Sequence, residues 1–349
     1  MRQSQILKAG DAGAGRGGER MTAVADPVDP HADAHGRAVS GTCTLGILTS
    51  GGDAPGMNAA IWASCESAAR IGWRVIGIQG GFRGLLERRH CALDPDRTLP
   101  WGRSGGTRLG TSRLADFERH KPDLDAALDE LGVDHLLIYG GNGSVNAASL
   151  LAERRPVIAV PATIDNDVSD SDASIGFATA IDAGLVLIDA MRDSAEALPR
   201  AFALETLGGD TGYLAAAVAD AGAADIVLVP EAPVGIPELI ARLRALLARR
   251  GYAVIVASEG YVDLDGTLRQ LSEATAMRVR LSRIGHSQRG GRPNAVDRRL
   301  AHAFARAGVS HLAAGRSGRL VWQRDRAALL PFVADATRRD VPTWALSDG

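Results

Sequence analysis

The sequence predicts an α/β fold built on a parallel, doubly wound sheet, and three repeated patterns support this prediction. Short hydrophobic strands are expected at 44–49, 73–78 and 135–139. Each strand is followed by a glycine-rich turn, and each turn is followed by a helical pattern. This order is typical of parallel sheets with helical crossovers. Because the turns then share one edge of the sheet, we expect them to build one crevice, where such sheets bind their ligands.

The first strand, 44–49, runs into the turn 50–56, which contains Gly51, Gly52 and Gly56, and a helix is expected from about Met57. A glycine turn in front of a helix presents free backbone N–H groups and the positive end of the helix dipole to an anion. A turn with a purely structural role would need fewer glycines. We therefore favour phosphate binding over a structural turn at this position.

Two further glycine segments belong to the same pattern. Segment 105–113 places small residues beside the guanidinium group of Arg113. The strand 135–139 enters the turn 140–144, which reads Gly-Gly-Asn-Gly-Ser, and a helix is expected from Val145. We expect both segments to line the crevice formed by the first turn.

A pair of acidic residues follows the next strand, which is expected at 156–160. Asp165 and Asp167 lie two residues apart, and Thr163 precedes them. Carboxylates at the exit of a buried strand can accept a proton from a substrate hydroxyl or hold a metal ion. The alternative is a turn whose aspartates only cap a helix.

The second half of the chain predicts another βαβ series with few glycine turns. Strands are expected at 200–206, 225–231 and 252–258, and helices at 178–192, 213–221 and 236–249. We interpret this series as a second domain that contributes side chains, including Glu259, rather than a phosphate cradle. The segment 280–291 then concentrates Arg280, His286 and Arg289 on a predicted glycine-containing strand. It is either a solvated basic face or an anion-binding segment.

Composition excludes several classes of protein. The 349 residues carry a net charge of −2, which argues against a strongly basic nucleic-acid binder. Only Lys8 and Lys121 carry ammonium groups, and neither follows a glycine-rich loop, so no Walker-type phosphate loop is present. Cys43, Cys65 and Cys91 are odd in number and widely spaced, which predicts reduced thiols rather than a disulfide framework or a zinc site. Without an apolar run of membrane-spanning length or a signal-peptide core, we expect a cytoplasmic protein that binds neither membrane nor nucleic acid.

The first 40 residues are rich in Gly, Ala, Asp and His without periodicity, which predicts a disordered leader over 1–40. Within it, residues 13–18 match the dinucleotide-binding string Gly-x-Gly-x-x-Gly. No strand precedes this string and no amphipathic helix follows it, so we interpret the match as chance. Met21 is an alternative start of translation.

The chain resembles the phosphofructokinase family from about Thr42 to Arg338, and six ordered segments carry the resemblance. The segments are 49–58, 106–113, 140–144, 161–167, 175–180 and 285–291. The resemblance implies a phosphofructokinase-like α/β fold of two Rossmann-like, doubly wound domains. The nucleotide-binding domain would comprise 41–177 plus 288–338, and the sugar-phosphate-binding domain 178–287 plus 339–349. It also implies transfer of the γ-phosphoryl group of ATP to the 1-hydroxyl of fructose 6-phosphate in glycolysis, with Mg²⁺ as the metal ion.

The same resemblance assigns roles to individual residues. Asp165 matches the general base of the family, with Thr163 beside it, while Asp167 and Asn142 occupy the positions near the metal ion. ATP would contact Gly51, Gly52, Arg113, Gly141, Asn142, Gly143 and Ser144. The sugar phosphate would contact Arg200, Leu207, Gly208, Glu259, Arg280, His286 and Arg289. In the family, Arg200 and Arg280 reach in from a neighbouring subunit, which implies a homo-oligomer, either a tetramer or a dimer.

Three positions depart from the family pattern. Asn142 stands where Asp is usual, Ala162 where Gly is usual, and Gly209 where Arg is usual. Loss of the charge at position 142 could cost on the order of 2–4 kcal/mol of transition-state stabilisation, or ~30 to ~1,000-fold in rate. Two alternatives to this kinase therefore stay open: a catalytically weakened sugar-phosphate-binding pseudoenzyme, and a kinase of a different phosphosugar.

Two further expectations follow from the resemblance. Pyrophosphate-using members carry Asp at the position of Gly143 and Lys at that of Ala162, so we expect ATP to be the donor here. Bacterial members bind a nucleoside diphosphate or phosphoenolpyruvate through arginines on the first helix, and the matching residues here are Trp62 and Glu66. A carboxylate in that place repels an anionic effector, so we expect no response to these ligands.

Overall fold

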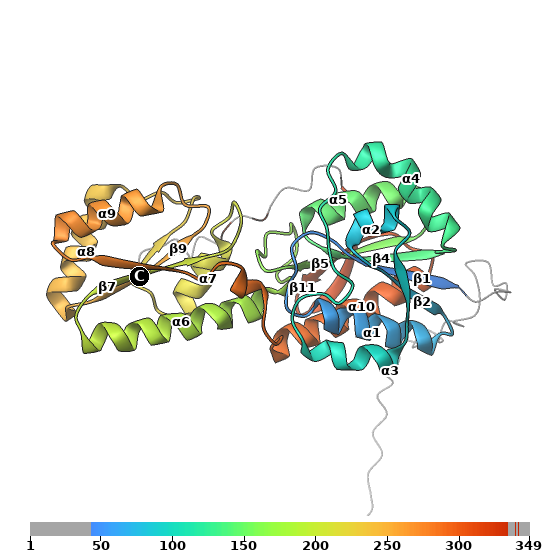
Figure 1. Cartoon of the computed structure of the whole chain (residues 1–349), viewed down its shortest axis with the longest axis horizontal. Helices are drawn as coiled ribbons and strands as arrows, with labels where there is room; N and C mark the ends of the chain where they lie inside the picture. The colour runs from blue at the N-terminus through green and yellow to red at the C-terminus, as the bar shows by residue number, and fades with distance from the viewer. Residues whose placement is uncertain (1–42, 334–338, 340, 342–349) are drawn as a thin grey trace, which may run out of the picture. The chain divides into compact units, whose positions relative to one another are not determined.

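The structure, a computed structural model, describes residues 43–333 together with Arg339 and Val341. The expected leader 1–40, the glycine string at 13–18 and the alternative start Met21 lie outside the described residues. The described chain contains two sheets, each covered by helices on both faces (Figure 1). Among the described residues, no helix combines the length and apolar character needed to cross a membrane.

The first sheet has the strand order β12-β11-β5-β4-β1-β2-β3, with β6 paired to β5. The strands are β1 (Thr44–Thr49), β2 (Arg74–Ile78), β3 (His90–Leu93), β4 (His135–Gly140), β5 (Val157–Thr163), β6 (Ile175–Gly176), β11 (Gly318–Gln323) and β12 (Arg326–Leu330). β1 pairs in parallel with both β2 and β4, and β5 pairs in parallel with β4, β6 and β11. Only the two edge pairings, of β3 with β2 and of β12 with β11, are antiparallel. The predicted parallel α/β sheet is therefore confirmed.

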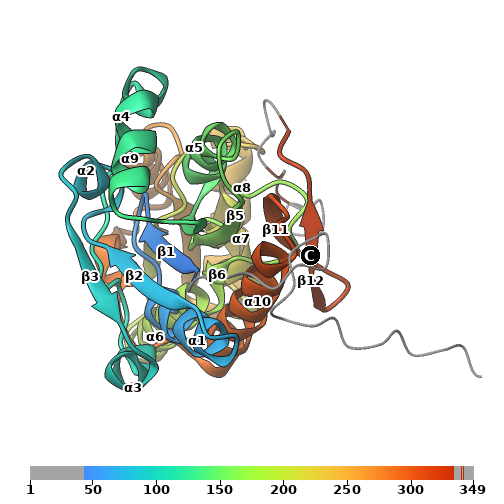
Figure 2. The ribbon, with the colours of Figure 1, turned by 90° about the vertical axis from the view of Figure 1, so that its right-hand side faces the viewer.

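Helices cover both faces of this sheet because successive strand residues point to opposite sides. The helices are α1 (Met57–Arg70), α2 (Gly81–Leu86), α3 (Pro95–Thr98), the 3₁₀ turn η1 (Leu99–Arg103), α4 (Phe117–Glu130), α5 (Asn142–Leu151) and α10 (Ala295–Ala313). Ile47 of β1 packs in one hydrophobic core with Ile61 of α1 and Phe304 of α10. Its neighbour Leu48 packs in a second core with Leu124 of α4 and residues of α5. Figure 2 shows α1 and α10 on one side of the sheet and α5 on the other.

The second sheet is fully parallel, in the order β10-β7-β9-β8. Its strands are β7 (Ala201–Thr206), β8 (Ile226–Leu228), β9 (Ala253–Ser258) and β10 (Val279–Arg283). Its helices are α6 (Phe177–Ala197), α7 (Tyr213–Ala221), α8 (Ile236–Arg250) and α9 (Leu264–Thr275). Apolar residues of α8 and α9 pack on one face, and those of α6 and α7 pack on the other. The assignment of the two sheets to nucleotide-binding and sugar-phosphate-binding domains stays a prediction.

Three sequence-based element assignments need correction. α5 begins at Asn142, not Val145, so the predicted turn is partly the first turn of the helix. β5 continues through Pro161 to Thr163. On one side it pairs with β11 as far as Ala159 and with β6 from Ala162 onward. Pro161 lies between these two pairings, so the strand tolerates a residue that has no N–H to donate. The segment 280–291 is not one strand, since β10 ends at Arg283 and a 3₁₀ turn, η2 (Gly285–Arg289), follows.

Candidate active site

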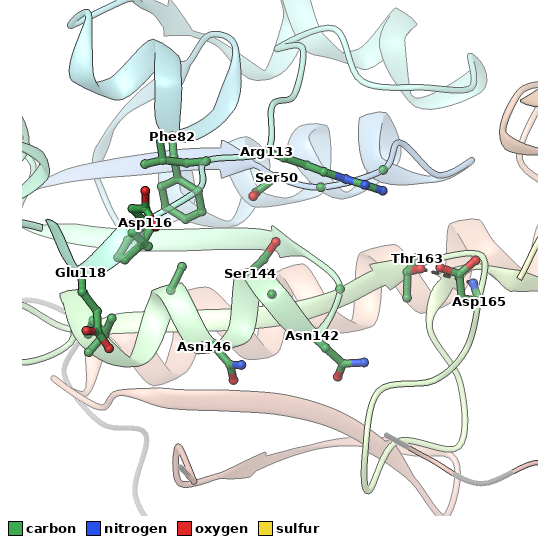
Figure 3. A pocket seen from close by; sticks show the side chains of 18 of the residues that line it. Ser50, Phe82, Arg113, Asp116, Glu118, Asn142, Ser144, Asn146, Thr163 and Asp165 are labelled. Atoms are coloured by element: carbon green, nitrogen blue, oxygen red, sulfur yellow. Dashed lines mark hydrogen bonds between the residues drawn. The ribbon is translucent and has the colours of Figure 1, made fainter. Parts of the chain in front are cut away.

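A cavity of about 960 Å³ lies at the carboxyl ends of β1, β4 and β5 (Figure 3). It is lined by Ser50, Gly51, Gly52, Phe82, Arg113, Leu114, Asp116, Phe117, Glu118, Arg119, Gly141, Asn142, Gly143, Ser144, Asn146, Ala147, Leu150, Thr163, Asp165, Asp167 and Arg289. All predicted nucleotide-binding residues and the acidic pair are therefore in one place. The volume suits a ligand of nucleotide size.

The turn after β1 forms one wall of the cavity and depends on its glycines. Gly51 has φ +84°, a left-handed conformation that favours glycine, and its carbonyl accepts a hydrogen bond from Thr111 Oγ1 at 2.8 Å. A Cβ atom on Gly52 would lie 2.5 Å from Nη1 of Arg289. The absence of a side chain at Gly52 thus lets a guanidinium group pack directly on the backbone.

The helix end that faces the cavity is that of α5, not that of α1. The first turn of α1 is buried and supplies no lining residue, which corrects the expectation from sequence. α5 begins after Gly141, has no side-chain cap and carries no acidic residue in its first turn. Its dipole and first N–H groups are therefore available to an anion. A Cβ on Gly143 would meet nothing within 4 Å, so the space beside this helix end is open.

The segment 105–113 is held in place from beneath by two buried polar side chains. Asn58 of α1 accepts a hydrogen bond from the Arg108 N–H at 2.7 Å and donates to the Gly105 carbonyl at 3.0 Å. Thr49, at the end of β1, donates to the Gly110 carbonyl at 2.8 Å. These contacts fix the segment that carries the exposed Arg113 at the edge of the cavity (Figure 3).

Asp165 follows β5 and is the strongest candidate for a proton acceptor. Its main-chain N–H donates to Thr163 Oγ1 at 3.2 Å, and its Oδ1 is 4.0 Å from the Arg289 guanidinium. Oδ1 is buried and has no hydrogen-bond partner among the described residues. Burial raises the pKa of the Asp165 carboxyl; Arg289 opposes this shift, while Asp167 and Glu259 add to it. A carboxylate with a raised pKa is suited to general-base catalysis.

Asp167 is bound to the start of α5 by the side chain of Asn142. Asn142 Nδ2 donates to Asp167 Oδ2 at 3.0 Å and to the Asp167 carbonyl at 3.3 Å. These two residues are 25 positions apart in sequence. The structure therefore brings together both residues that the sequence placed near the metal ion.

The donor atoms fit Mg²⁺ only together with a polyphosphate. No group of three or more His, Cys, Asp or Glu side chains suited to a metal ion exists among the described residues. The cavity offers the carboxylates of Asp165 and Asp167 and the side-chain oxygen of Asn142, all oxygen ligands of the kind that Mg²⁺ prefers. Mg²⁺ commonly takes one or two carboxylates and completes its shell with phosphate oxygens and water.

The loop after β7 approaches Asp165 from the second sheet. Glu259 Oε1 accepts hydrogen bonds from the N–H groups of Gly208 and Gly209, at 3.0 and 2.7 Å. A Cβ on Gly209 would lie 3.9 Å from Asp165 Oδ2. Glu259, Leu207 and Gly208 do not line the cavity itself. The loop after β7 nevertheless places Gly209 beside Asp165.

The remaining predicted residues are farther from the cavity. His286 is exposed on η2, whose last residue Arg289 does line the cavity. Arg280 pairs with Phe202 in the second sheet and is exposed, and Arg200 precedes β7. The structure does not bring Arg200 and Arg280 to Asp165 within one chain. Ala162 is fully buried in β5 and packs in the hydrophobic core instead of facing the cavity.

Sequence reasoning missed one wall of the cavity, made by the start of α4. This wall and its neighbours comprise Ser50, Phe82, Leu114, Asp116, Phe117, Glu118, Arg119, Asn146, Ala147 and Leu150. Pro122 lies inside α4, and Asp116 before it has φ +50°, so neither the helix interior nor its start follows the usual sequence signals. Phe82 and Phe117 pack edge to face at 4.9 Å, and the aromatic residue after Gly80 and Gly81 was the available signal.

Comparisons with known proteins agree with this geometry. The family model described as Phosphofructokinase matches residues 44–312. The chain is 37% identical over 303 residues to ATP-dependent 6-phosphofructokinase 1 of Thermus thermophilus, covering 84% of this chain and 94% of the relative. It is also 37% identical over 281 residues to ATP-dependent 6-phosphofructokinase of Bacillus subtilis, covering 79% of this chain and 88% of the relative.

Solved structures show the same fold. Phosphofructokinase from Saccharomyces cerevisiae superposes with a TM-score of 0.78 at 26% identity, over 83% of this chain and 45% of the yeast chain. This chain thus spans less than half the length of that relative. A pyrophosphate-dependent phosphofructokinase from Marinobacter aquaeolei, at 23% identity and a TM-score of 0.78, covers 86% of each chain and supports the fold alone. From the matched residues, the identities and the shared fold together, the chain belongs to the phosphofructokinase family.

Proposed function

We propose that this protein is an ATP-dependent kinase that transfers the γ-phosphoryl group of ATP to the 1-hydroxyl of fructose 6-phosphate. The observation that carries the proposal is the presence of an uncapped helix start and a half-buried carboxylate with a raised pKa in one cavity. The relatives named ATP-dependent 6-phosphofructokinase support both the donor and the acceptor.

The cavity residues divide the chemistry between them. The start of α5 and the N–H of Gly52 hold the polyphosphate, while the Gly51 N–H donates to the Ser112 carbonyl at 3.4 Å and so shapes the turn. Asp165 accepts the proton of the 1-hydroxyl while the bond from that oxygen to the γ-phosphorus forms and the bond from this phosphorus to the β-phosphate oxygen breaks. Arg289 and Arg113 offset the negative charge on the transferred group.

A bound Mg²⁺ would neutralise negative charge on the phosphates, and Asp167 and the Asn142 side-chain oxygen are the groups that would hold it. Because phosphoryl transfer requires little covalent chemistry from the protein, positioning and charge stabilisation are sufficient roles for these residues.

The open space at Gly143 supports ATP rather than pyrophosphate as the donor. A side chain at this position would occupy the space in front of α5, and an acidic one would repel the outer phosphates of a nucleotide. The aromatic and helical wall of Phe82, Phe117 and α4 extends the cavity beyond the phosphates, which gives room for a nucleoside.

We further propose that the acceptor site is shared between subunits of a homo-oligomer, tetramer or dimer, in the cytoplasm. Arg280 lies three residues before Arg283 at the carboxyl end of β10, about 10 Å along the strand, and Arg200 lies six residues before Thr206, about 20 Å. An arginine side chain does not span 20 Å, so Arg200 serves the site of another copy. In this proposal Glu259, Leu207, Gly208, His286 and Arg289 complete the sugar-phosphate site.

A coupled ADP-release assay tests the function, with MgATP and a panel of sugar phosphates. We expect turnover with fructose 6-phosphate that depends on Asp165. Turnover with only a different phosphosugar would contradict the acceptor, and binding without any Asp165-dependent turnover would contradict the kinase.

A subunit-mixing experiment tests the shared site. Asp165→Asn and Arg200→Ala proteins are each expected to be nearly inactive. After partial dissociation and reassembly of a mixture, a site that combines one intact copy of each residue should recover part of the wild-type activity. Absence of recovery in verified mixed oligomers would refute a site built from two chains.

A further inference from the structure

We propose that Asn142 and Gly143 form a self-modification site, at which the Asn142 side chain loses its amide nitrogen and becomes a carboxylate inside the cavity. Asn142 is the only asparagine in the sequence that precedes a glycine. The proposal concerns the free protein and does not depend on the proposed function.

The reaction needs only the chain and water. The main-chain nitrogen of Gly143 loses its proton to hydroxide and attacks Cγ of Asn142, which forms a new C–N bond and closes a succinimide ring. The bond from Cγ to Nδ2 breaks, and the leaving nitrogen takes a proton from water and departs as ammonia. Water then opens the ring at either carbonyl carbon. One opening gives aspartate, and the other gives isoaspartate, in which the main chain runs through the side-chain carbon.

The attacking nitrogen is not committed to a hydrogen bond of the helix. Gly143 is the second residue of α5, and the first N–H groups of a helix have no partner within it. Within the part of the chain that the structure describes, the Gly143 N–H has no main-chain acceptor, and α5 has no side-chain cap. In the interior of a helix the same nitrogen would donate to a carbonyl of the preceding turn, which would hold it away from the side chain.

The position is also open to solvent. Gly143 is exposed, and a Cβ built on it would meet nothing within 4 Å. Hydroxide and water can therefore reach the nitrogen through the cavity. Glycine has no side chain that would crowd the closing ring, and its backbone rotates more freely than that of any other residue.

Ring closure requires the first turn of α5 to open, and few contacts oppose this opening. The N–H groups of Ser144 and Val145 both donate to the Gly141 carbonyl, at 2.9 and 3.2 Å, and these bonds must break. The hydrogen bonds from Asn142 Nδ2 to Asp167, at 3.0 and 3.3 Å, must break as well. The end of a helix opens at a lower free energy than the whole protein unfolds. Local opening of this turn therefore sets the rate.

The modification changes the charge and the shape of the cavity wall. Aspartate at position 142 adds a negative charge at the start of α5, where the helix dipole favours it and the nearby Asp167 carboxylate opposes it. Isoaspartate also lengthens the main chain by a methylene group, which displaces the first turn of the helix. Both products alter the part of the wall to which the proposed function assigns the polyphosphate.

The test is peptide mass mapping of the full chain during prolonged incubation in neutral and in mildly alkaline buffer. We expect a mass gain of about 1 Da, which fragment ions place at Asn142. It should form faster in the alkaline buffer, because hydroxide removes the amide proton. The modified chain should migrate with Asn142→Asp in isoelectric focusing, and an isoaspartyl methyltransferase should label the isoaspartate. Asn146, exposed on the same helix and followed by Ala147, is the internal control and should stay unchanged.

Gly143→Ala is the matched variant. Gly143 does not belong to the glycines with a positive φ, and its Cβ position is empty, so alanine fits without strain. An unchanged melting temperature checks that the variant folds. Alanine should slow the modification at least about tenfold, because its Cβ crowds the ring and restricts the backbone.

A sample unfolded in guanidinium chloride calibrates the assay, because the same bond reacts there without restraint from the fold. If Asn142 of the folded protein stays unchanged while the unfolded sample reacts, the fold protects the site and the proposal is overturned. It is equally overturned if Gly143→Ala reacts as fast as the wild type, or if Asn146 reacts as fast as Asn142. Turnover is not measured, so a protein without kinase activity would reject the proposed function and leave this test unaffected.

Discussion

Asp165→Asn separates the proposed catalytic role of the carboxylate from its effect on stability. Loss of a general base lowers the rate by about 10²–10⁴-fold, which corresponds to about 3–5 kcal/mol of transition-state stabilisation. We therefore expect kcat to fall by this factor, with a small change in KM for ATP, because in the proposed function the phosphates are held by backbone N–H groups.

The same substitution should stabilise the folded protein. At 4.0 Å and an effective dielectric constant of about 20, the attraction between Arg289 and Asp165 is about 4 kcal/mol. The pKa of Asp165 is nevertheless raised, so burial, together with the nearby carboxylates of Asp167 and Glu259, outweighs this attraction, and the ionised carboxylate costs folding free energy. The neutral amide that replaces the carboxylate carries no such cost, so the melting temperature of the variant at neutral pH should exceed that of the wild type.

The sign of the pH dependence follows from the same pKa. The folded carboxyl has a higher pKa than the unfolded one, so the folded state takes up a proton first as pH falls. The cost of the charge is fully present above the folded pKa and is relieved below it. The advantage of Asp165→Asn in melting temperature should therefore shrink as pH falls through the folded pKa.

The assay combines steady-state kinetics with thermal unfolding from acid to neutral pH. Asp189→Asn, at an exposed aspartate on α6, is the matched control and should leave both quantities unchanged. A kcat within a few-fold of the wild type would refute the role of Asp165 as the base. A variant that melts below the wild type at neutral pH would refute the electrostatic reasoning.

Four other predictions follow from the structure. First, because burial raises the pKa of Asp165, kcat/KM should begin to decline, as pH is lowered, at a pH above the ordinary pKa range of an aspartate. A kcat/KM that stays constant down to that ordinary range would contradict this. Second, Asp297→Ala should lower the free energy of unfolding in urea by about 2–5 kcal/mol. The N–H groups of Gly176 and Thr179 donate to Asp297 at 2.9 and 2.7 Å, and the substitution leaves both without a hydrogen-bond acceptor. A loss below about 1 kcal/mol would show that water replaces the carboxylate. Third, Gly143→Asp should raise KM for ATP at least about tenfold without loss of melting temperature, since its Cβ meets nothing within 4 Å and a helix start favours an acidic residue. Fourth, ADP and phosphoenolpyruvate should not change the fructose 6-phosphate saturation curve, because Glu66 pairs with Arg70 and Trp62 packs against His302; a shifted curve would reveal another effector site.

Local sequence was enough to predict the strands and turns around the site. β1 and α7 have the predicted bounds, because alternating or amphipathic apolar patterns and short-range turn chemistry decide such elements. The left-handed conformation of Gly51 likewise follows from a glycine turn. The predicted crevice is also confirmed, since parallel strands with helical crossovers must deliver their carboxyl ends to one edge.

Other features depended on contacts that no local pattern contains. α4 was missed because its interior proline hides the helical signal, and α5 begins inside a predicted turn because packing on β4 and β5 favours an earlier start. The antiparallel edge strands β3 and β12 form because they pair with β2 and β11, and their own composition does not indicate a strand.

By itself, the sequence determined that this chain has an α/β fold with glycine turns and a carboxylate pair at one sheet edge. Only the tertiary structure decided which atoms meet there. It brought Arg289 to the Asp53 carbonyl, 236 positions away, and Asn142 to Asp167, 25 positions away. The physical reason is that local patterns act over a few residues, whereas these pairings depend on how helices and crossovers pack around the sheets.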